Sequence, residues 1–267
     1  ITGVGSGFKD LDAKTSGFQK GDMVLIAARP SMGKTTFALN IAEHAALREG
    51  KKVVIFSLEM SKEQLAYKLL CSQANVDMLA LRTGNLEDKD WENIARAAGP
   101  LAAAQIFIDD TAGVSVMEMR SKCRRIKMEH GIDLIMIDYL QLMNSAKKTE
   151  SRVQEISELT RSLKLMAKEI DVPVILLSQL SRSVEKDDRA PRLSDLRDSG
   201  SIEQDADIVM FLSRPMGADT EAKNQNVCDF LIEKNRHGKT GKVTLQWDGS
   251  HTSFKAISYE PIPENMG

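Results

Sequence analysis

The sequence has few cysteines, and it lacks a long apolar run. Three cysteines lie far apart at Cys71, Cys123 and Cys228. This number and spacing argue against a disulfide framework and against paired zinc ligands. They favour a reducing, cytoplasmic setting. No stretch approaches the roughly 20 apolar residues of a membrane-spanning helix, and no signal peptide is recognisable, so we expect no membrane partner. Because the first residue is Ile1, we expect a fragment or a processed chain.

An excess of charge of one sign is also missing. The 36 basic residues face 38 acidic ones, which gives a net charge of −2. Such a chain has no overall field to hold nucleic acid or an anionic membrane, so any such binding must come from a local surface. Its 267 residues, 42% of them hydrophobic, can bury one full core. We expect a single domain over residues 1–267, with a leading segment at 1–20 and a flexible tail at 258–267.

Short apolar runs alternate with helical patterns along most of the chain. This order predicts an α/β fold with a mostly parallel, twisted sheet and helices on both faces. A strand-rich end then predicts an antiparallel C-terminal edge. The expected strands are 23–27, 53–57, 106–108, 134–137, 174–177, 208–212, 227–232 and 243–247, and the expected helices are 37–49, 62–71, 89–98, 116–130 and 153–170. The polar stretches 144–150 and 182–192 are interpreted as mobile loops.

The stretch from Ala28 to Thr36 joins the first strand to a helix. Such a junction directs backbone N–H groups and a helix dipole at one point, which suits a polyphosphate. Lys34 is expected to reach the outer phosphates and Thr35 to hold Mg²⁺. The usual pattern begins with glycine, and Ala28 departs from it, so an ordinary strand-to-helix turn is the alternative. The candidate nucleotide-binding residues are Ala28, Arg29, Pro30, Ser31, Met32, Gly33, Lys34, Thr35 and Thr36.

Three other expected strands end in polar residues, and parallel strands bring such ends to one edge of a sheet. Asp138 has the form of the acidic residue of a magnesium shell, and its alternative is a cap for the next segment. Glu59 could orient and deprotonate water, although a charge at a helix N-terminus fits the spacing equally well. Gln179 could sense the γ-phosphate, but a lone polar residue carries little weight.

Near the end of the sequence, Lys234 and Arg236 flank Asn235 in the run KNRHG. A paired lysine and arginine beside glycine suggests an arginine finger. A solvated hairpin is an equally good interpretation of this stretch on its own.

Taken in order, these stretches resemble the RecA-like motor domain of DnaB-type replicative helicases over nearly the whole chain. The resemblance is carried by ARPSMGKTT, FSLEM, LIMIDYLQLM, VILLSQLSR and DLRDSGSIEQDADIVMFLSR, with KNRHG near the end. It implies a RecA-like P-loop NTPase that forms a homohexameric ring, encircles single-stranded DNA and translocates 5′ to 3′. The implied cofactors are ATP or another nucleoside triphosphate, and Mg²⁺.

The resemblance also implies roles for individual residues. Glu59 would be the catalytic base, and Gln179 the γ-phosphate sensor. Lys34, Thr35 and Asp138 would hold phosphate and Mg²⁺, in a loop that tolerates a small residue such as Ala28. Lys234 and Arg236 would act in trans on the nucleotide of the neighbouring subunit.

For DNA, the resemblance implies backbone contacts by Arg197, Asp198 and Gly200. The surrounding residues 181–197 hold five basic and four acidic side chains, so several subunits are needed to build a useful field. No aromatic residue lies between Tyr139 and Phe211, which leaves phosphate contacts without base stacking. The basic run 120–127 is interpreted as a solvated helix face rather than a second DNA site.

Two other classes of function compete with a helicase. A RecA-type recombinase shares the core but forms an open filament, and a nucleotide-gated scaffold would form a ring without useful turnover. The resemblance implies primase and a helicase loader as partners of the full-length family member. It also implies that the family's N-terminal domain is absent from this sequence.

Overall fold

The computed structural model describes residues 2–140, 143, 152–180, 189–214 and 226–257, and the side chains of 152 and 197–201 lie outside this description. Within it, nine strands form one sheet in the order β3-β2-β4-β5-β1-β6-β7-β8-β9. The strands from β3 to β6 in that order are parallel, and β7, β8 and β9 are antiparallel. The strands are β1 (Met23–Ala28), β2 (Val53–Ser57), β3 (Ile106–Asp109), β4 (Leu134–Asp138), β5 (Val174–Gln179), β6 (Ile208–Ser213), β7 (Val227–Asn235), β8 (Gly241–Asp248) and β9 (Ser253–Ala256).

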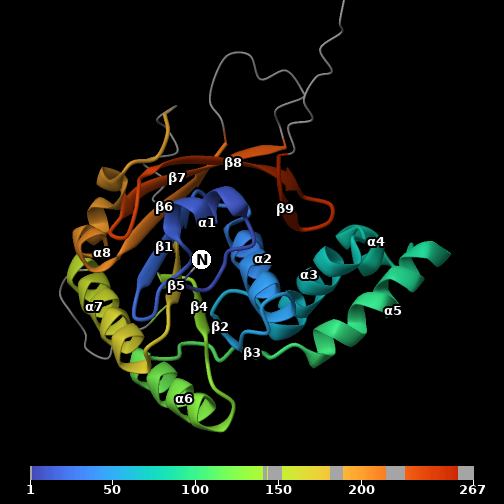
Figure 1. The fold of residues 1–267 in the computed structure, drawn as a ribbon, viewed down its shortest axis with the longest axis horizontal. Helices are drawn as coiled ribbons and strands as arrows, with labels where there is room; N and C mark the ends of the chain where they lie inside the picture. The colour runs from blue at the N-terminus through green and yellow to red at the C-terminus, as the bar shows by residue number, and fades with distance from the viewer. Residues whose placement is uncertain (1, 141–142, 144–151, 181–188, 215–225, 258–267) are drawn as a thin grey trace, which may run out of the picture.

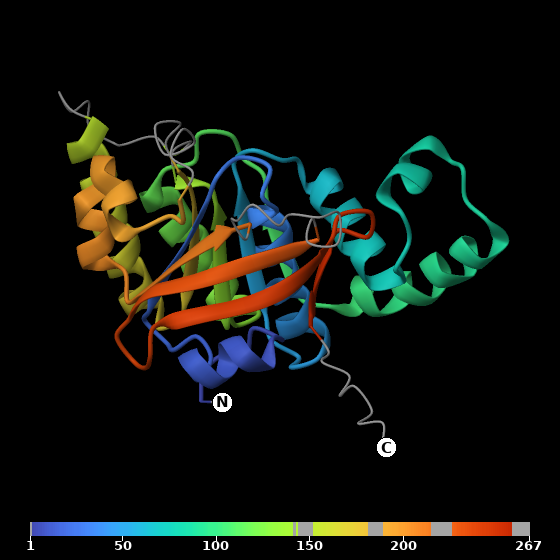
Figure 2. The same cartoon turned by 90° about the horizontal axis from the view of Figure 1, so that it is seen from above.

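Helices cover both faces of this sheet. One buried cluster joins α1, α2 and α3 to one face, and a second joins α6, α7 and α8 to the other. Figure 1 and Figure 2 place α4 and α5 at the opposite end of the molecule from α7 and α8. The helices are α1 (Lys9–Thr15), α2 (Lys34–Leu47), α3 (Lys62–Ala74), α4 (Met78–Thr83), α5 (Asp88–Ala103), α6 (Val116–Glu129), α7 (Arg152–Ile170), the 3-10 helix η3 (Leu193–Ser199) and α8 (Gly200–Asp205).

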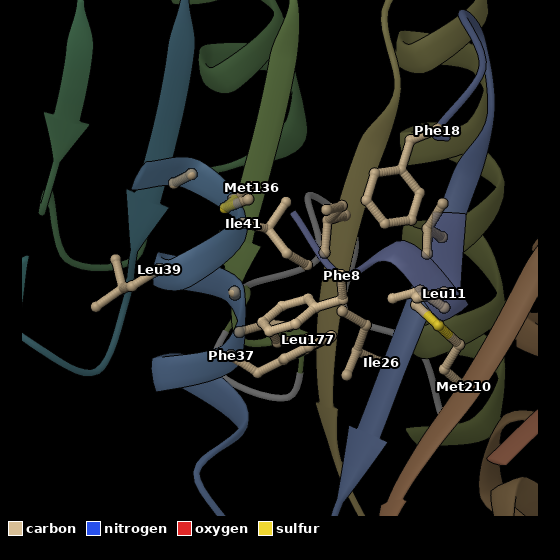
Figure 3. Close-up of a cluster of buried hydrophobic side chains, with 14 of the residues drawn as sticks. Phe8, Leu11, Phe18, Ile26, Phe37, Leu39, Ile41, Met136, Leu177 and Met210 are labelled. Atoms are coloured by element: carbon tan, nitrogen blue, oxygen red, sulfur yellow. The ribbon is translucent and has the colours of Figure 1, made fainter. Parts of the chain in front are cut away.

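Helix α2, which begins inside the candidate phosphate loop, is the most deeply packed helix near the candidate site. Its Phe37 is fully buried and packs on Phe230 of β7, with a distance of 4.1 Å between ring centroids. Figure 3 shows Phe37 beside Ile26 and Leu177 of the parallel strands. Burying a side chain of this size stabilises a fold by roughly 1.5–3 kcal/mol, so the start of α2 is held firmly against the sheet.

The structure confirms the predicted α/β class, the mostly parallel sheet and the antiparallel edge. All eight expected strands are present, most of them one to three residues longer than predicted. The prediction was wrong by omission at α1, α4, η3, α8 and β9, all of them seven residues or shorter. Segments 144–150 and 182–188 and the tail 258–267 lie outside the described residues.

The three cysteines are buried, and part of the basic run is paired with a neighbouring helix. Cys71, Cys123 and Cys228 are free and buried, and burial raises their thiol pKa values to about 11, 12 and 11. In the basic run on α6, Arg120 and Arg124 form ion pairs with Glu169 of α7. These arginines therefore join two helices. Within the described chain, no helix is long and apolar enough to cross a bilayer.

Candidate functional site

A pocket of about 420 Å³ opens at the carboxyl end of β1. The loop that lines it leaves β1 after Ala28 and enters α2 through Gly33. Ser31 and Gly33 both have left-handed backbone conformations, with φ of 60° and 86°. Successive turns of this kind direct backbone N–H groups into one concavity, which is a common form of anion site. The predicted phosphate loop therefore has the geometry that its sequence indicated.

The departure from the usual pattern at Ala28 has a simple structural reason. Ala28 is the last residue of β1 and pairs with Gln179 on one side and Leu212 on the other. It is 1% exposed and does not have a positive φ. A regular strand position does not require glycine, so the small side chain of alanine fits this buried place.

Gly33, in contrast, needs to be glycine for two reasons. Its φ of 86° is unfavourable for other residues, and an added Cβ would lie 3.1 Å from ring carbons of Trp247 and Phe254. We expect Gly33→Ala to cost about 1–2 kcal/mol from the backbone alone, and more from crowding. Urea unfolding and nucleotide titration measure the two effects, and we expect both stability and affinity to fall.

Gly84 offers a matched control for this substitution. Its φ of 74° is similar, but no atom lies within 4 Å of an added Cβ. Gly84→Ala should lose only the backbone contribution and should leave nucleotide affinity unchanged. Equal losses of stability in the two variants would contradict the close contact at Gly33.

Asp138 is held against the start of α2. The hydroxyl of Thr35 donates a hydrogen bond to Oδ2 of Asp138 at 2.6 Å, and Nζ of Lys34 lies 3.6 Å from Oδ1. Asp138 is 4% exposed, and its Oδ1 is buried without a hydrogen-bond partner. A buried carboxylate oxygen without such a partner is costly unless a cation compensates for it. The hydroxyl and carboxylate oxygens present are ligands suited to Mg²⁺, so the residues fit the predicted metal.

Lys34 lies in a partly desolvated setting. Burial lowers the pKa of its ammonium group, and the charges of Asp138 and Glu59 partly oppose this shift. Its Nζ also lies 4.3 Å from the centroid of the Tyr139 ring. A cation in such a position has few partners besides Asp138, so an added phosphate would stabilise its charged form.

Glu59 and Gln179 both line the same pocket, as predicted. Glu59 is exposed and follows β2. Helix α3 begins three residues later at Lys62, and the preceding Ser61 is its N-cap and forms a capping box with Gln64. The cap of this helix is therefore Ser61, which leaves the carboxylate of Glu59 beside the pocket. Gln179 is the last residue of β5 and lies next to Ala28.

Three residues that line the pocket, Met60, Lys68 and Trp247, were not among the predicted site residues. Lys68 lies on α3, where burial lowers its pKa and the charge of Asp138 raises it. Trp247 lies on β8, and its ring approaches Gly33. Lys68 follows Ser61 by seven residues, which is two helical turns. This spacing could have indicated from the sequence that Lys68 faces the same side of α3 as its start. The sequence gives no such signal for Trp247, because only the pairing of β7, β8 and β9 brings it to the phosphate loop.

Lys234 and Arg236 lie at the amino ends of the parallel strands, whereas the pocket lies at their carboxyl ends. Asn235, between them, pairs with Ile208, the first residue of β6, whereas the phosphate loop follows the last residue of β1. A six-residue strand spans about 20 Å, so these cations are far from the pocket of their own chain. The run KNRHG does lead from β7 into the hairpin with β8. Its two cations, however, contact the end of α8 and Asp207.

The predicted DNA-contacting residues lie just before this end of α8. Arg197 and Asp198 belong to η3 and Gly200 begins α8, while their side chains lie outside the described residues. Nearby, Arg189 forms two hydrogen bonds with Asp195, at 2.8 and 2.6 Å. One of the basic residues counted in this region is therefore neutralised within the chain.

Comparisons with known proteins agree with this geometry. A model of the DnaB-like helicase C-terminal domain family matches residues 3–256. The replicative DNA helicase DnaC of Bacillus subtilis (strain 168) is 50% identical over 256 residues, which are 95% of this chain and 56% of the relative. The replicative DNA helicase DnaB of Geobacillus stearothermophilus gives the same values. The chain thus spans about half the length of these relatives.

Solved structures show the same relationship. A solved ATPase domain superposes with a TM-score of 0.92 at 42% identity, covering 97% of this chain and 92% of that one. A DnaB-like replicative helicase, studied with its interactions with primase, gives 0.92 at 41% identity, covering 97% and 62%. The RadB recombinase, at 17% identity and a TM-score of 0.59 over 96% and 100%, shares the RecA-like fold alone. The phosphate loop, Asp138 and these matches together show that the chain belongs to the DnaB-like helicase C-terminal domain family.

Proposed function

We propose that this chain is the ATP-dependent motor of a replicative DNA helicase. In this proposal, a hexameric ring hydrolyses nucleotide between its subunits, translocates 5′ to 3′ on single-stranded DNA and unwinds duplex at a replication fork. The observation that carries it is the placement of Lys34 and Arg236 at opposite edges of one sheet. A subunit arranged in this way can complete a site only with a neighbour, and repetition of such a head-to-tail contact forms a ring where the rotation between subunits closes.

The pocket supplies the groups that phosphoryl transfer needs. Lys34 and the backbone of the phosphate loop would hold the β- and γ-phosphates. Thr35 and Asp138 would hold Mg²⁺, which neutralises charge on the phosphate oxygens when it is bound. Glu59 would take the proton of the attacking water, and Gln179 would contact the γ-phosphate. Lys68 and Trp247 would border the nucleotide, with the indole ring as a surface for the base.

The remaining charge comes from the neighbour in this proposal. Phosphoryl transfer spreads negative charge over the γ-phosphate, and an arginine supplied in trans stabilises it. Arg236 of the adjoining subunit would provide that charge, with Lys234 beside it. Hydrolysis would then depend on assembly as well as on the pocket.

DNA would contact η3 and the start of α8, through Arg197, Asp198 and Gly200. Few basic residues are available in each subunit, so the field that holds the strand must come from several copies around a channel. Contacts with phosphates carry little sequence information, which suits a motor that runs along any sequence. We also propose primase and a loader as partners of the full-length protein.

Unwinding assays separate this function from recombination. We expect the full-length protein with ATP and Mg²⁺ to unwind a forked duplex that has a 5′ single-stranded tail, and to fail on one that has only a 3′ tail. Joining of homologous duplexes without unwinding would instead support the recombinase alternative. A ring that binds ATP but neither hydrolyses it nor unwinds DNA would support the scaffold alternative. Native mass measurements with nucleotide and DNA would test the hexamer.

A further inference from the structure

Tyr139 directly follows Asp138, the last residue of β4. Its ring faces the ammonium group of Lys34 at the start of α2, with Nζ 4.3 Å from the ring centroid. A cation over the face of an aromatic ring is attracted by the negative charge of the π system, and contacts of this kind extend to about 6 Å. The ring is therefore close enough to stabilise the cation that is expected to hold the outer phosphates.

The backbone around Tyr139 is held by buried neighbours. Asp138 and Leu140, on either side of it, are 4% and 0% exposed. The carbonyl oxygen of Asp138 accepts a hydrogen bond from the backbone N–H of Leu58 at 2.7 Å, which ties the end of β4 to the segment after β2. The ring itself is partly buried and packs against the apolar cluster that joins α2 to the sheet. The position of the ring beside Lys34 is therefore set by the fold.

The two neighbours of the Lys34 ammonium group differ in how they would affect a bound phosphate. Oδ1 of Asp138 lies 3.6 Å from Nζ, and its negative charge attracts the lysine but repels a phosphate. The Tyr139 ring carries no net charge. The side chain of Lys34 is only 11% exposed, and a cation removed from water in this way needs a partner. An aromatic ring can supply that partner without opposing the anion that the lysine binds.

We propose that Tyr139 is a positioning residue of the nucleotide site, whose ring face keeps the charged end of Lys34 in place for the outer phosphates. The inference rests on the nucleotide-binding role proposed above for Lys34. Tyr139 would act through Lys34, without touching phosphate itself. Because the contact uses the face of the ring, phenylalanine should replace tyrosine well, whereas an aliphatic side chain should not.

Equilibrium binding of ADP to the full-length protein tests the inference without depending on turnover. We expect Tyr139→Phe to bind ADP as tightly as the unsubstituted protein does. Tyr139→Leu should bind it about 5- to 30-fold more weakly, as the loss of a desolvated cation–π contact predicts. In the Lys34→Met background, Tyr139→Leu should cause no further loss, because the cation is already absent. Losses that multiply in the double variant would show that Tyr139 acts independently of Lys34, and would overturn the positioning role.

Fluorinated phenylalanines at position 139 separate the charge of the ring face from its shape, and they serve also if Tyr139→Leu folds poorly. Fluorine withdraws electrons from the ring, which weakens its attraction for a cation and changes its size little. As one, two and three fluorine atoms are added, the affinity for ADP should fall step by step below that of Tyr139→Phe. The matched control is the same series at Phe18, which is 0% exposed among apolar side chains (Figure 3), and its affinity should stay constant.

The outcomes distinguish this inference from the proposed function. Equal affinity across the series at position 139 would show that the ring only fills space. That result would overturn the positioning role and leave the proposed function intact. If the unsubstituted protein bound neither ADP nor ATP, the proposed function would fail, and the role of Tyr139 would fail with it.

Discussion

Glu59→Gln is expected to lower the kcat of ATP hydrolysis by about 100- to 10,000-fold, the range typical of losing a general base. Glutamine keeps the size and the hydrogen-bonding oxygen of the side chain but cannot accept a proton from water. Glu59 lines the pocket beside the phosphate loop and interacts electrostatically with Lys34. Its removal should therefore leave nucleotide bound but not hydrolysed. Steady-state hydrolysis and a fluorescent-nucleotide titration measure the two properties separately.

Glu63→Gln is the matched control for this substitution. Glu63 is an exposed acidic residue in the first turn of α3, four positions further along the chain. Hydrogen bonds at the start of the helix lower its pKa, and it does not line the pocket. Hydrolysis should be unchanged in this variant. If Glu59→Gln also hydrolysed ATP at the normal rate, the base would have to be another residue.

Much of the fold was predictable because buried parallel strands have a clear sequence signal. Runs such as 53–56 and 134–137 are apolar throughout, since both faces of the sheet are covered. The short elements were missed for a different reason. In α4 the end signals were available, because Asp77 caps its start and Gly84 follows its end, but the helix has only six residues and none of them is buried. The edge strand β9 has only four residues, too few for a periodicity to be recognised.

The candidate site was predictable where it is local in sequence. Lys34, Thr35 and Asp138 lie in motifs whose spacing indicates their place at strand ends. Trp247 was not predictable, because its approach to Gly33 depends on the register of three antiparallel strands. The partners of Lys234 and Arg236 were not predictable either. Apart from the carboxylate of Asp207, their contacts are backbone carbonyls at the end of α8, and carbonyls of this kind have no identifying residue type.

The trans role of Arg236 predicts recovery of activity when two inactive variants are mixed. Arg236→Ala subunits keep Lys34, and Lys34→Ala subunits keep Arg236, so a mixed interface of one orientation contains both groups. Each variant alone should be almost inactive. In rings mixed at equal amounts, about a quarter of the interfaces should be complete, because head-to-tail contacts pair each pocket with a different subunit. DNA-stimulated ATP hydrolysis across a series of mixing ratios measures this recovery.

A second mixture shows whether recovery depends on the side from which each residue comes. Lys34 and Glu59 line one pocket of one chain, so no interface formed by Lys34→Ala and Glu59→Gln subunits can hold both groups. This mixture should stay inactive at every ratio. Activity in the first mixture and none in the second would place Arg236 across the interface from Lys34. If neither mixture recovered, although native mass measurements showed mixed rings, the trans finger would be wrong. The contacts of Arg236 with Asp207 and Gln204 would then serve the stability of a single subunit.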